Sequence, residues 1–264
     1  MELRQRALRA LQTSDIQGKV DQSSAIWSQF ASFSIANHDI PEPPGLPGRP
    51  AQPNLVAPTL VPQRSPFTVA GRAALIHAIC HIEFNAINLA LDAVWRFSAM
   101  PPDFYRDWMR VAFEEAQHFT LLHDHLQSLG HHYGDFPAHD GLWEMCEKTR
   151  DDIVARMALV PRTLEARGLD ATPLIQARLR KVGTPDALTA CDLLDIILHD
   201  EIGHVTIGNH WYHWLCKRDG LDPVAHYSVL VQRHRAPRLR PPFNETARRQ
   251  AGFSAQELDY LLGS

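Results

Sequence analysis

The chain has 264 residues, of which 45% are hydrophobic and 21% charged, and its formal net charge is −4. This composition suits one large or two small domains of a soluble globular protein. It lacks the basic character of a general nucleic-acid-binding protein. Arginines gather only within 233–249, and we interpret that stretch as a solvated surface in preference to a phosphate- or RNA-binding patch.

Cysteine usage and hydropathy indicate the compartment. Four scattered cysteines form no Cys-x-x-Cys motif, so we expect reduced, buried thiols. No uninterrupted apolar run reaches the roughly 18 residues of a membrane-spanning helix. Residues 1–15 lack the apolar core of a secretory signal. We therefore expect a cytoplasmic protein with no membrane contact.

The N-terminal extension, residues 1–66, is expected to pack on the rest of the chain. Residues 1–40 predict one or two short helices. Residues 41–66 contain nine of the 19 prolines. Proline fixes φ and removes a backbone donor, so this stretch predicts an extended strap, and its Leu and Val residues favour contact with the body of the protein.

The pattern becomes helical from residue 67, and residues 67–220 predict a four-helix bundle. Proline near the helix starts and glycine beyond the ends mark boundaries. The expected helices are 67–98, 102–129, 141–167 ending at Gly168, a short piece at 172–182, and 184–218. Residues 221–264 predict a C-terminal helical extension. Strand-like alternation is nearly absent, so the predicted fold is all-α, a ferritin-like four-helix bundle between these extensions.

Two copies of Glu-x-x-His, Glu115–His118 and Glu201–His204, lie on the apolar stripes of their predicted helices. The second copy lies in the middle of a seam that repeats every three or four residues along 194–215. One such pair arises readily by chance and favours a structural hydrogen bond. Two copies at buried positions are different, because an ionised carboxylate is costly to bury without a compensating charge. Two metal ions are the simplest compensation for both.

The other two long helices also carry a glutamate on their stripes. Glu83 is the only charged residue on the first seam, and Glu165 shares the stripe of the third helix with Pro161, which must kink or thin that helix. Glu144 and Glu147 are alternative ligands near the start of the third helix. The resulting order is that of di-iron and di-manganese carboxylate bundles.

The donor types indicate which metals would bind. Residues three apart share a helix face, so each motif can hold one ion, and four carboxylates balance two divalent cations. Oxygen and imidazole donors without a thiolate suit iron or manganese better than structural zinc. We predict two iron ions, with manganese or a mixed iron–manganese pair as the alternative. The predicted ligands are Glu83, Glu115, His118, Glu165, Glu201 and His204.

Other polar residues have simpler interpretations. The string HDEIGH (199–204) is not the zinc-protease motif, because its histidines are five apart. His77 and His81 flank the first seam, so we expect them at the surface or behind the ligands. The histidines at 131, 132 and 139 are expected in a solvated loop. Tyr105 and Tyr212 are candidate redox-active neighbours of a metal, with their orientation left open.

Longer segments resemble the ferritin-like family catalogued as domain of unknown function 455, over residues 67–262. They are HIEFNAINLALDAVWRF (81–97), FEEAQHF (113–119), ARMALVPRTLEARGLD (155–170), HDEIGHV (199–205) and PPFNETARRQAGF (241–253). The resemblance implies a ferritin-like bundle with a di-metal centre, and no particular activity. The stretch LEARGLD is also similar to a segment of the ferritin-like tRNA hydroxylases in which a similar Glu-Ala-Arg supplies a ligand, which favours Glu165 over Glu144 and Glu147.

Our leading functional hypothesis is a non-haem di-iron oxygenase, hydroxylase or oxidase that acts on dioxygen and a small-molecule substrate. Glu115 and Glu201 are the expected bridging ligands. The small residues Ala86, Ala90, Gly203 and Gly208 are expected to leave room for a substrate. A tRNA substrate is kept by analogy alone, and no oligomeric state follows from the sequence.

Two rival hypotheses remain. The first is a non-enzymatic metal-binding or structural ferritin-like protein, although the strap and the tail would obstruct an iron-storage cage. The second is a scaffold with a vestigial site.

Overall fold

A computed structural model describes residues 2–263. Contacts divide the chain into two compact units, Met1–Trp143 (unit 1) and Glu144–Ser264 (unit 2). Residues 2–263 contain two isolated β-bridges and no β-strand, which confirms the all-α prediction. The boundary between the units falls within the range 67–220 expected for the bundle.

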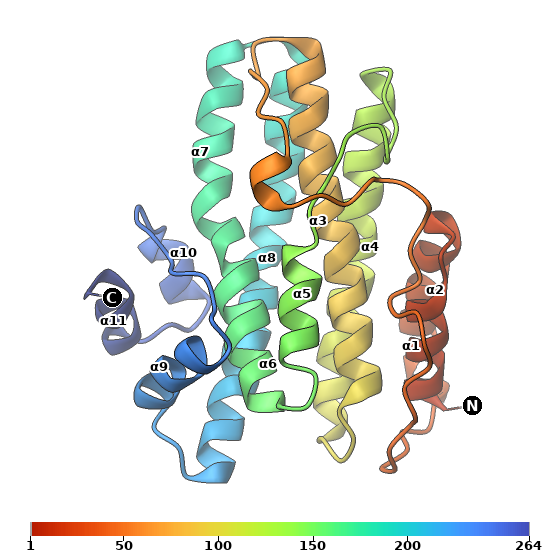
Figure 1. Ribbon diagram of the computed structural model, residues 1–264, viewed down its shortest axis with the longest axis vertical. Helices are drawn as coiled ribbons and strands as arrows, with labels where there is room; N and C mark the ends of the chain where they lie inside the picture. The colour runs from red at the N-terminus through yellow and green to blue at the C-terminus, as the bar shows by residue number, and fades with distance from the viewer. Residues whose placement is uncertain (1, 264) are drawn as a thin grey trace. The chain divides into compact units, whose positions relative to one another are not determined.

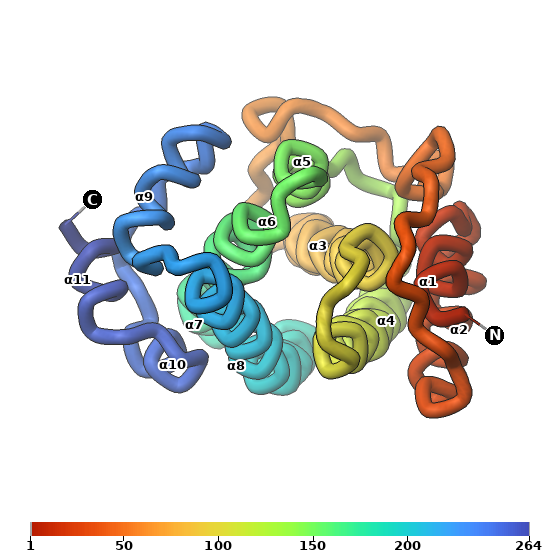
Figure 2. The backbone as a smooth tube through the Cα atoms, turned by 90° about the horizontal axis from the view of Figure 1, so that it is seen from below, coloured from red at the N-terminus to blue at the C-terminus, as the bar shows by residue number. Residues whose placement is uncertain are grey.

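Unit 1 is built around two long helices, close to the expected ranges. α3 and α4 lie side by side, α1 packs on α3, and α2 packs on α4 (Figures 1 and 2). The elements of unit 1 are α1 (Leu3–Gln12), α2 (Ile16–Ser28), η1 (Phe30–Ser32), η2 (Pro58–Leu60), α3 (Val69–Arg96) and α4 (Pro102–Ser128). Helix α3 has the length and composition of a membrane span, with a mean hydropathy of 1.4, but 72% of that window is buried, as in the core helix of a soluble protein.

The proline-rich strap packs along unit 1. The Val56 amide donates to Ala138 O at 2.9 Å, and the Ala138 amide donates to Asn54 O at 3.1 Å. Arg49 forms an ion pair of 2.6 Å with Asp140. The strap is therefore joined to the loop that follows α4.

A buried lysine links the strap to three helices. Lys19 on α2 donates to Gly48 O at 2.9 Å and to Leu11 O at 3.3 Å, and it also donates to the side chain of Asn88 on α3. Its ammonium group lies 5.1 Å from the centre of the Phe84 ring. Burial lowers the pKa of Lys19 to about 7, because the charged form loses its hydration.

Unit 2 is built around α8, which packs against α6, η3 and α7 (Figure 1). The α5 helix (Gly141–Lys148) spans the boundary between the units. The other elements are α6 (Ile153–Leu159), the π-helical turn η3 (Val160–Glu165), α7 (Ala166–Val182), α8 (Pro185–Asp219), α9 (Pro223–Arg233), α10 (Glu245–Gln250) and α11 (Ala255–Gly263).

The predicted third helix, 141–167, begins at the expected residue, but its unbroken course and its end were wrong. The chain leaves helix after Lys148 and begins a new helix at Ile153, where the Asp152 carboxylate caps the amide of Ala155 at 2.9 Å. Gly168 does not end a helix but lies inside α7. The actual end is Gly183, whose φ of +68° is one that glycine adopts without strain.

Pro161 explains the π turn in the middle of this helix. Proline has no N–H to donate, and its ring clashes with the carbonyl group four residues earlier in an α-helix. A regular α-helix therefore cannot continue through Pro161. The chain inserts the wider turn η3 (Val160–Glu165) between α6 and α7 and continues as a helix. Such turns are rare and are frequent at functional sites. The expected irregularity at Pro161 is therefore confirmed, and its form is a π turn.

The four cysteines agree with the sequence prediction. All are buried, and among residues 2–263 they form no disulfide bond.

Candidate metal centre

In unit 1 the predicted ligands come from two adjacent helices. Glu83 lies in the middle of α3, and Glu115 and His118 lie one turn apart on α4. Their exposed fractions are 4%, 0% and 1%, so the predicted stripes do bury these polar side chains. The neighbouring Glu114 is partly exposed and pairs with Arg110 at 2.9 Å.

These three side chains converge. His118 Nδ1 lies 3.4 Å from Glu115 Oε2 and 3.6 Å from Glu83 Oε2. One donor atom of each lies within 4.8 Å of the others, so the group is able to hold a metal ion. Burial alone would lower the pKa of His118, but the two carboxylates outweigh it and raise that pKa to about 11. The local field therefore favours a positive charge, which a proton or a divalent cation can provide.

In unit 2 the second motif repeats this arrangement on α8. His204 Nδ1 lies 3.6 Å from Glu201 Oε1, and the two residues are 0% and 9% exposed. In both motifs the imidazole therefore turns Nδ1 toward the carboxylate one turn earlier.

Glu165 is the last residue of the π turn, and it is 7% exposed. The two alternative ligands proposed from the sequence, Glu144 and Glu147, both lie on α5. Glu144 is exposed, and Glu147 is partly exposed and pairs with Arg150 at 3.4 Å. A carboxylate exposed to water gains little by binding a metal ion that is held in a dry site. Burial therefore favours Glu165 over Glu144 and Glu147 as the ligand.

The donor set fits a divalent metal of the iron or manganese type. Each unit supplies carboxylate oxygens and an imidazole nitrogen, with no thiolate among the predicted ligands. The ligand assignment remains a prediction, since burial and proximity are also found in structural Glu–His pairs.

Gly208 on α8 faces the π turn. A Cβ atom built on Gly208 would lie 2.6 Å from Pro161 Cβ and 2.8 Å from Pro161 Cγ. Glycine therefore allows α8 to approach the turn that ends at Glu165. The expectation that Gly208 leaves room for a substrate was wrong, because the Pro161 ring fills that space.

Replacing Gly208 with alanine is expected to destabilise the protein by about 1–3 kcal/mol, because the rigid proline ring cannot move away without shifting the turn. Gly168→Ala is the matched control. No heavy atom lies within 4 Å of a Cβ built there, so that change should stabilise α7 by about 0.5–1 kcal/mol. Urea denaturation of the two variants measures both effects, and equal stabilities would contradict this assignment.

His77 and His81 were expected either at the surface or behind the ligands. They do not lie at the surface. They are 0% and 6% exposed. His77 Nε2 accepts from the Gly134 amide at 2.9 Å, and His81 Nδ1 lies 2.8 Å from the Tyr133 hydroxyl. The sequence assigned no role to Tyr133, because its neighbours read as a solvated loop. The side chains of His132 and His139 are indeed exposed.

His77 should make unit 1 sensitive to acid. Burial lowers its pKa to about 4, although Asp135 acts in the opposite direction. A histidine in the unfolded chain has a pKa near 6.5. Between pH 6.5 and pH 4 the unfolded state therefore binds a proton that folded His77 does not bind. The free energy of unfolding then falls as the pH is lowered through that window. His77→Gln keeps an acceptor but does not titrate. We expect the parent to lose about 2 kcal/mol more than this variant between pH 7 and pH 5 in urea titrations. Equal losses would contradict the burial of a neutral His77.

Tyr105 and Tyr212 are both buried, and both hydroxyls donate to backbone oxygens. Tyr105 donates to Phe97 O at 2.9 Å, and Tyr212 donates to Pro223 O at 2.7 Å. Burial raises the pKa of each phenol. These contacts account for the two tyrosines structurally, and a redox role for either stays a prediction.

Comparison with known proteins places the chain in a family. The model of the family described as protein of unknown function (DUF455) matches residues 12–259. An uncharacterized protein of Haemophilus influenzae is 53% identical over 219 residues, which cover 80% of this chain and 75% of that protein. No solved structure matches. The chain therefore belongs to the DUF455 family.

Proposed function

We propose that this protein is a ferritin-like di-metal carboxylate protein. Its six predicted ligands would hold two metal ions, with iron preferred. The observation that carries the proposal is the repeated geometry. Each unit contains a buried Glu-x-x-His whose imidazole Nδ1 lies 3.4 Å or 3.6 Å from its own carboxylate.

We further propose that the protein is an oxygen-dependent oxidoreductase acting on a small molecule. Two ferrous ions would supply the electrons for the reduction of dioxygen. The protein would hold its carboxylates and neutral imidazoles as ligands and exclude water from them, which the low exposure of these side chains supports. Because mixed oxygen and nitrogen donors stabilise iron without a thiolate, the ligand set suits this chemistry.

A second candidate is a metal-binding protein with no organic substrate. The cavities within the units favour it. One in unit 1 measures about 30 Å³, and one in unit 2 measures about 10 Å³. A small-molecule site usually needs roughly 300 Å³ or more, so neither of these two cavities accommodates a substrate.

Metal content tests the proposal first. Elemental analysis of protein purified without chelators should find about two iron or manganese ions per chain, the number that this type of ligand set holds. His118→Gln should lose at least one ion, whereas His123→Gln, a partly exposed residue on the same helix, should lose none. Absence of metal from the parent after anaerobic addition of Fe(II) would refute the di-metal proposal.

Oxygen consumption then separates the two candidates. The iron-loaded protein is mixed with an electron donor, and dioxygen uptake is followed in the presence of a library of small molecules. Uptake that depends on one compound and yields its oxidised product supports the oxidoreductase. Stable metal binding without compound-dependent uptake favours the metal-binding candidate.

A further inference from the structure

The C-terminal segment PPFNETARRQAGF (241–253) carries part of the family resemblance, yet none of its residues is a predicted ligand. Within unit 2, α10 packs against α7 and α8. Residues 241–257, here called the tail clamp, make polar contacts with the π turn that ends at Glu165 and with the first residues of α7 after it. These contacts bear on how Glu165 is held, so this inference rests on the proposed metal centre.

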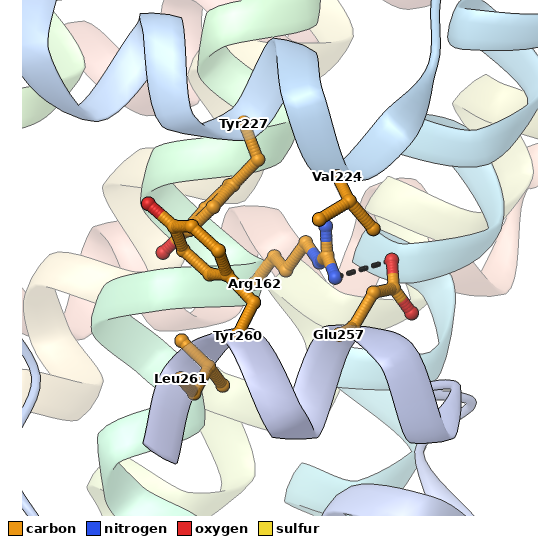
Figure 3. A pocket seen from close by; sticks show the side chains of 6 residues that line it. All are labelled: Arg162, Val224, Tyr227, Glu257, Tyr260 and Leu261. Carbon is orange, nitrogen blue, oxygen red and sulfur yellow. Dashed lines mark hydrogen bonds and ion pairs between the residues drawn. The ribbon is translucent and has the colours of Figure 1, made fainter. Parts of the chain in front are cut away.

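Arg162 joins the π turn to the tail clamp on one side. The side chain is 4% exposed, and its Nη2 donates to Glu257 Oε1 at 2.5 Å (Figure 3). Its guanidinium lies 4.8 Å, 5.2 Å and 4.9 Å from the ring centres of Tyr212, Tyr227 and Phe253. A buried arginine enclosed by three rings and one carboxylate has little freedom to move.

Glu257 is itself held in place from several directions. It accepts from the Ser254 amide at 2.8 Å and lies 2.8 Å from His213 Nε2 on α8. Burial would raise its pKa, but His213, Arg162 and the Ser254 amide outweigh that effect and lower the pKa to about 2. Glu257 is therefore an ionised partner for Arg162 at neutral pH.

A second buried arginine, Arg248, joins the tail clamp to the residues after Glu165. It is 0% exposed, donates to the two carboxylate oxygens of Asp170 at 3.0 Å and 2.6 Å, and donates to Ala166 O at 3.3 Å. The Phe253 ring lies 5.1 Å from this guanidinium as well as 4.9 Å from that of Arg162. One aromatic ring thus contacts both arginines.

The tail clamp is also tied to the helices by its backbone and amide groups. The Asn244 amide donates to Asp170 Oδ1 at 2.8 Å, and its side chain donates to Leu169 O at 3.2 Å. From α8, the side chain of Asn209 donates to Ala251 O at 2.7 Å. The clamp is therefore anchored to α7, which follows the turn, and to α8, which packs against the turn.

The π turn explains why Arg162 and Glu165 have different surroundings. In an α-helix, residues three apart share a face, but a π turn has more residues per turn and separates them further around the axis. Arg162 can then face the tail while Glu165 faces elsewhere. Holding residues 162, 166 and 170 fixes the backbone on both sides of Glu165.

We propose that the tail clamp positions Glu165 for metal binding, with Arg162 and Arg248 as positioning residues that act through the π turn. Residues that orient a ligand typically change metal affinity about 10–100-fold when they are replaced. Loss of the clamp should therefore weaken the binding of the metal ion that Glu165 would hold.

Hydrogen exchange and metal titration on the full chain test this proposal. In the metal-free protein, Phe253→Leu should raise the exchange rate of amides 160–166 about tenfold and leave those of α3 unchanged. In Co(II) titrations the same variant should bind one ion about tenfold more weakly, with altered visible absorption from the bound Co(II). Arg248→Gln should give the same pattern more strongly.

Arg249→Gln is the matched control, because Arg249 neighbours Arg248 in sequence but is 52% exposed and pairs with the exposed Glu245 at 3.3 Å. It should match the parent in both measurements. Phe253→Leu remains informative if Arg248→Gln fails to fold. Unchanged exchange at 160–166, or an equal rise in all helices of unit 2, overturns the proposal. If the parent binds two Co(II) ions and Phe253→Leu binds them with equal affinity, the tail-clamp proposal is overturned and the proposed metal centre is not. If the parent binds no Co(II), the proposed metal centre is overturned as well.

Discussion

Replacing Glu115 with glutamine is expected to abolish the stabilisation that metal confers on this protein. A ligand that binds only the folded state stabilises it by about 2.7 kcal/mol when its concentration is a hundred times its dissociation constant. Glu115 is 0% exposed and its Oε2 lies 3.4 Å from His118 Nδ1, so water cannot take the place of its carboxylate as a ligand. Thermal unfolding with Mn(II), or with a chelator in its place, should show a shift for the parent and none for Glu115→Gln.

Glu114→Gln controls for the loss of a glutamate from the same turn of α4. Its side chain is 20% exposed and pairs with Arg110, so this variant should keep the full shift. A Glu115→Gln variant that still gains stability from Mn(II) would remove Glu115 from the ligand set. A parent whose melting temperature does not change on chelation would favour a vestigial site on a scaffold.

Replacing Asp170 with alanine is expected to destabilise the protein strongly. Arg248 is 0% exposed, and Asp170 accepts two of its hydrogen bonds at 3.0 Å and 2.6 Å. Removing one partner of a buried ion pair leaves an uncompensated charge, which typically costs about 3–5 kcal/mol. Urea denaturation followed by circular dichroism measures this loss.

A double variant separates the charge effect from lost packing. Asp170→Ala combined with Arg248→Met removes both charges and keeps an apolar side chain against Phe253. It should recover part of the stability that Asp170→Ala loses, because the pair is coupled. A double variant whose loss relative to the parent equals the sum of the losses of the two single variants would indicate that the two residues act independently.

The sequence predicted the long helices well, because their signals are local. The apolar stripes, Pro102 and Pro185 at the first helical positions, and the glycines beyond the ends depend on neighbours within a few residues. The same periodicity placed Glu83, Glu115, His118, Glu201 and His204 on buried faces, and all five are buried.

The break after Lys148 was missed, although a local signal exists. Asp152 is a good N-cap residue three positions before Ala155, but it lies in a stretch rich in charged residues that is also compatible with helix. The form of the irregularity at Pro161 was not predictable from local pattern either. A proline can end a helix, kink it or widen it, and the close approach of Gly208 accompanies the widened turn.

By itself, the sequence determined that the chain is helical, where its three longest helices begin and end, and which glutamates and histidines share a buried face. Only the tertiary structure decided what surrounds these residues. Arg162 meets Glu257 across 95 residues and Arg248 meets Asp170 across 78 residues, and His77 is buried by a loop that reads as solvated. Helix formation is governed by interactions between residues three or four apart, whereas ion pairs and burial depend on which distant segments fold together, and periodicity carries no record of those partners.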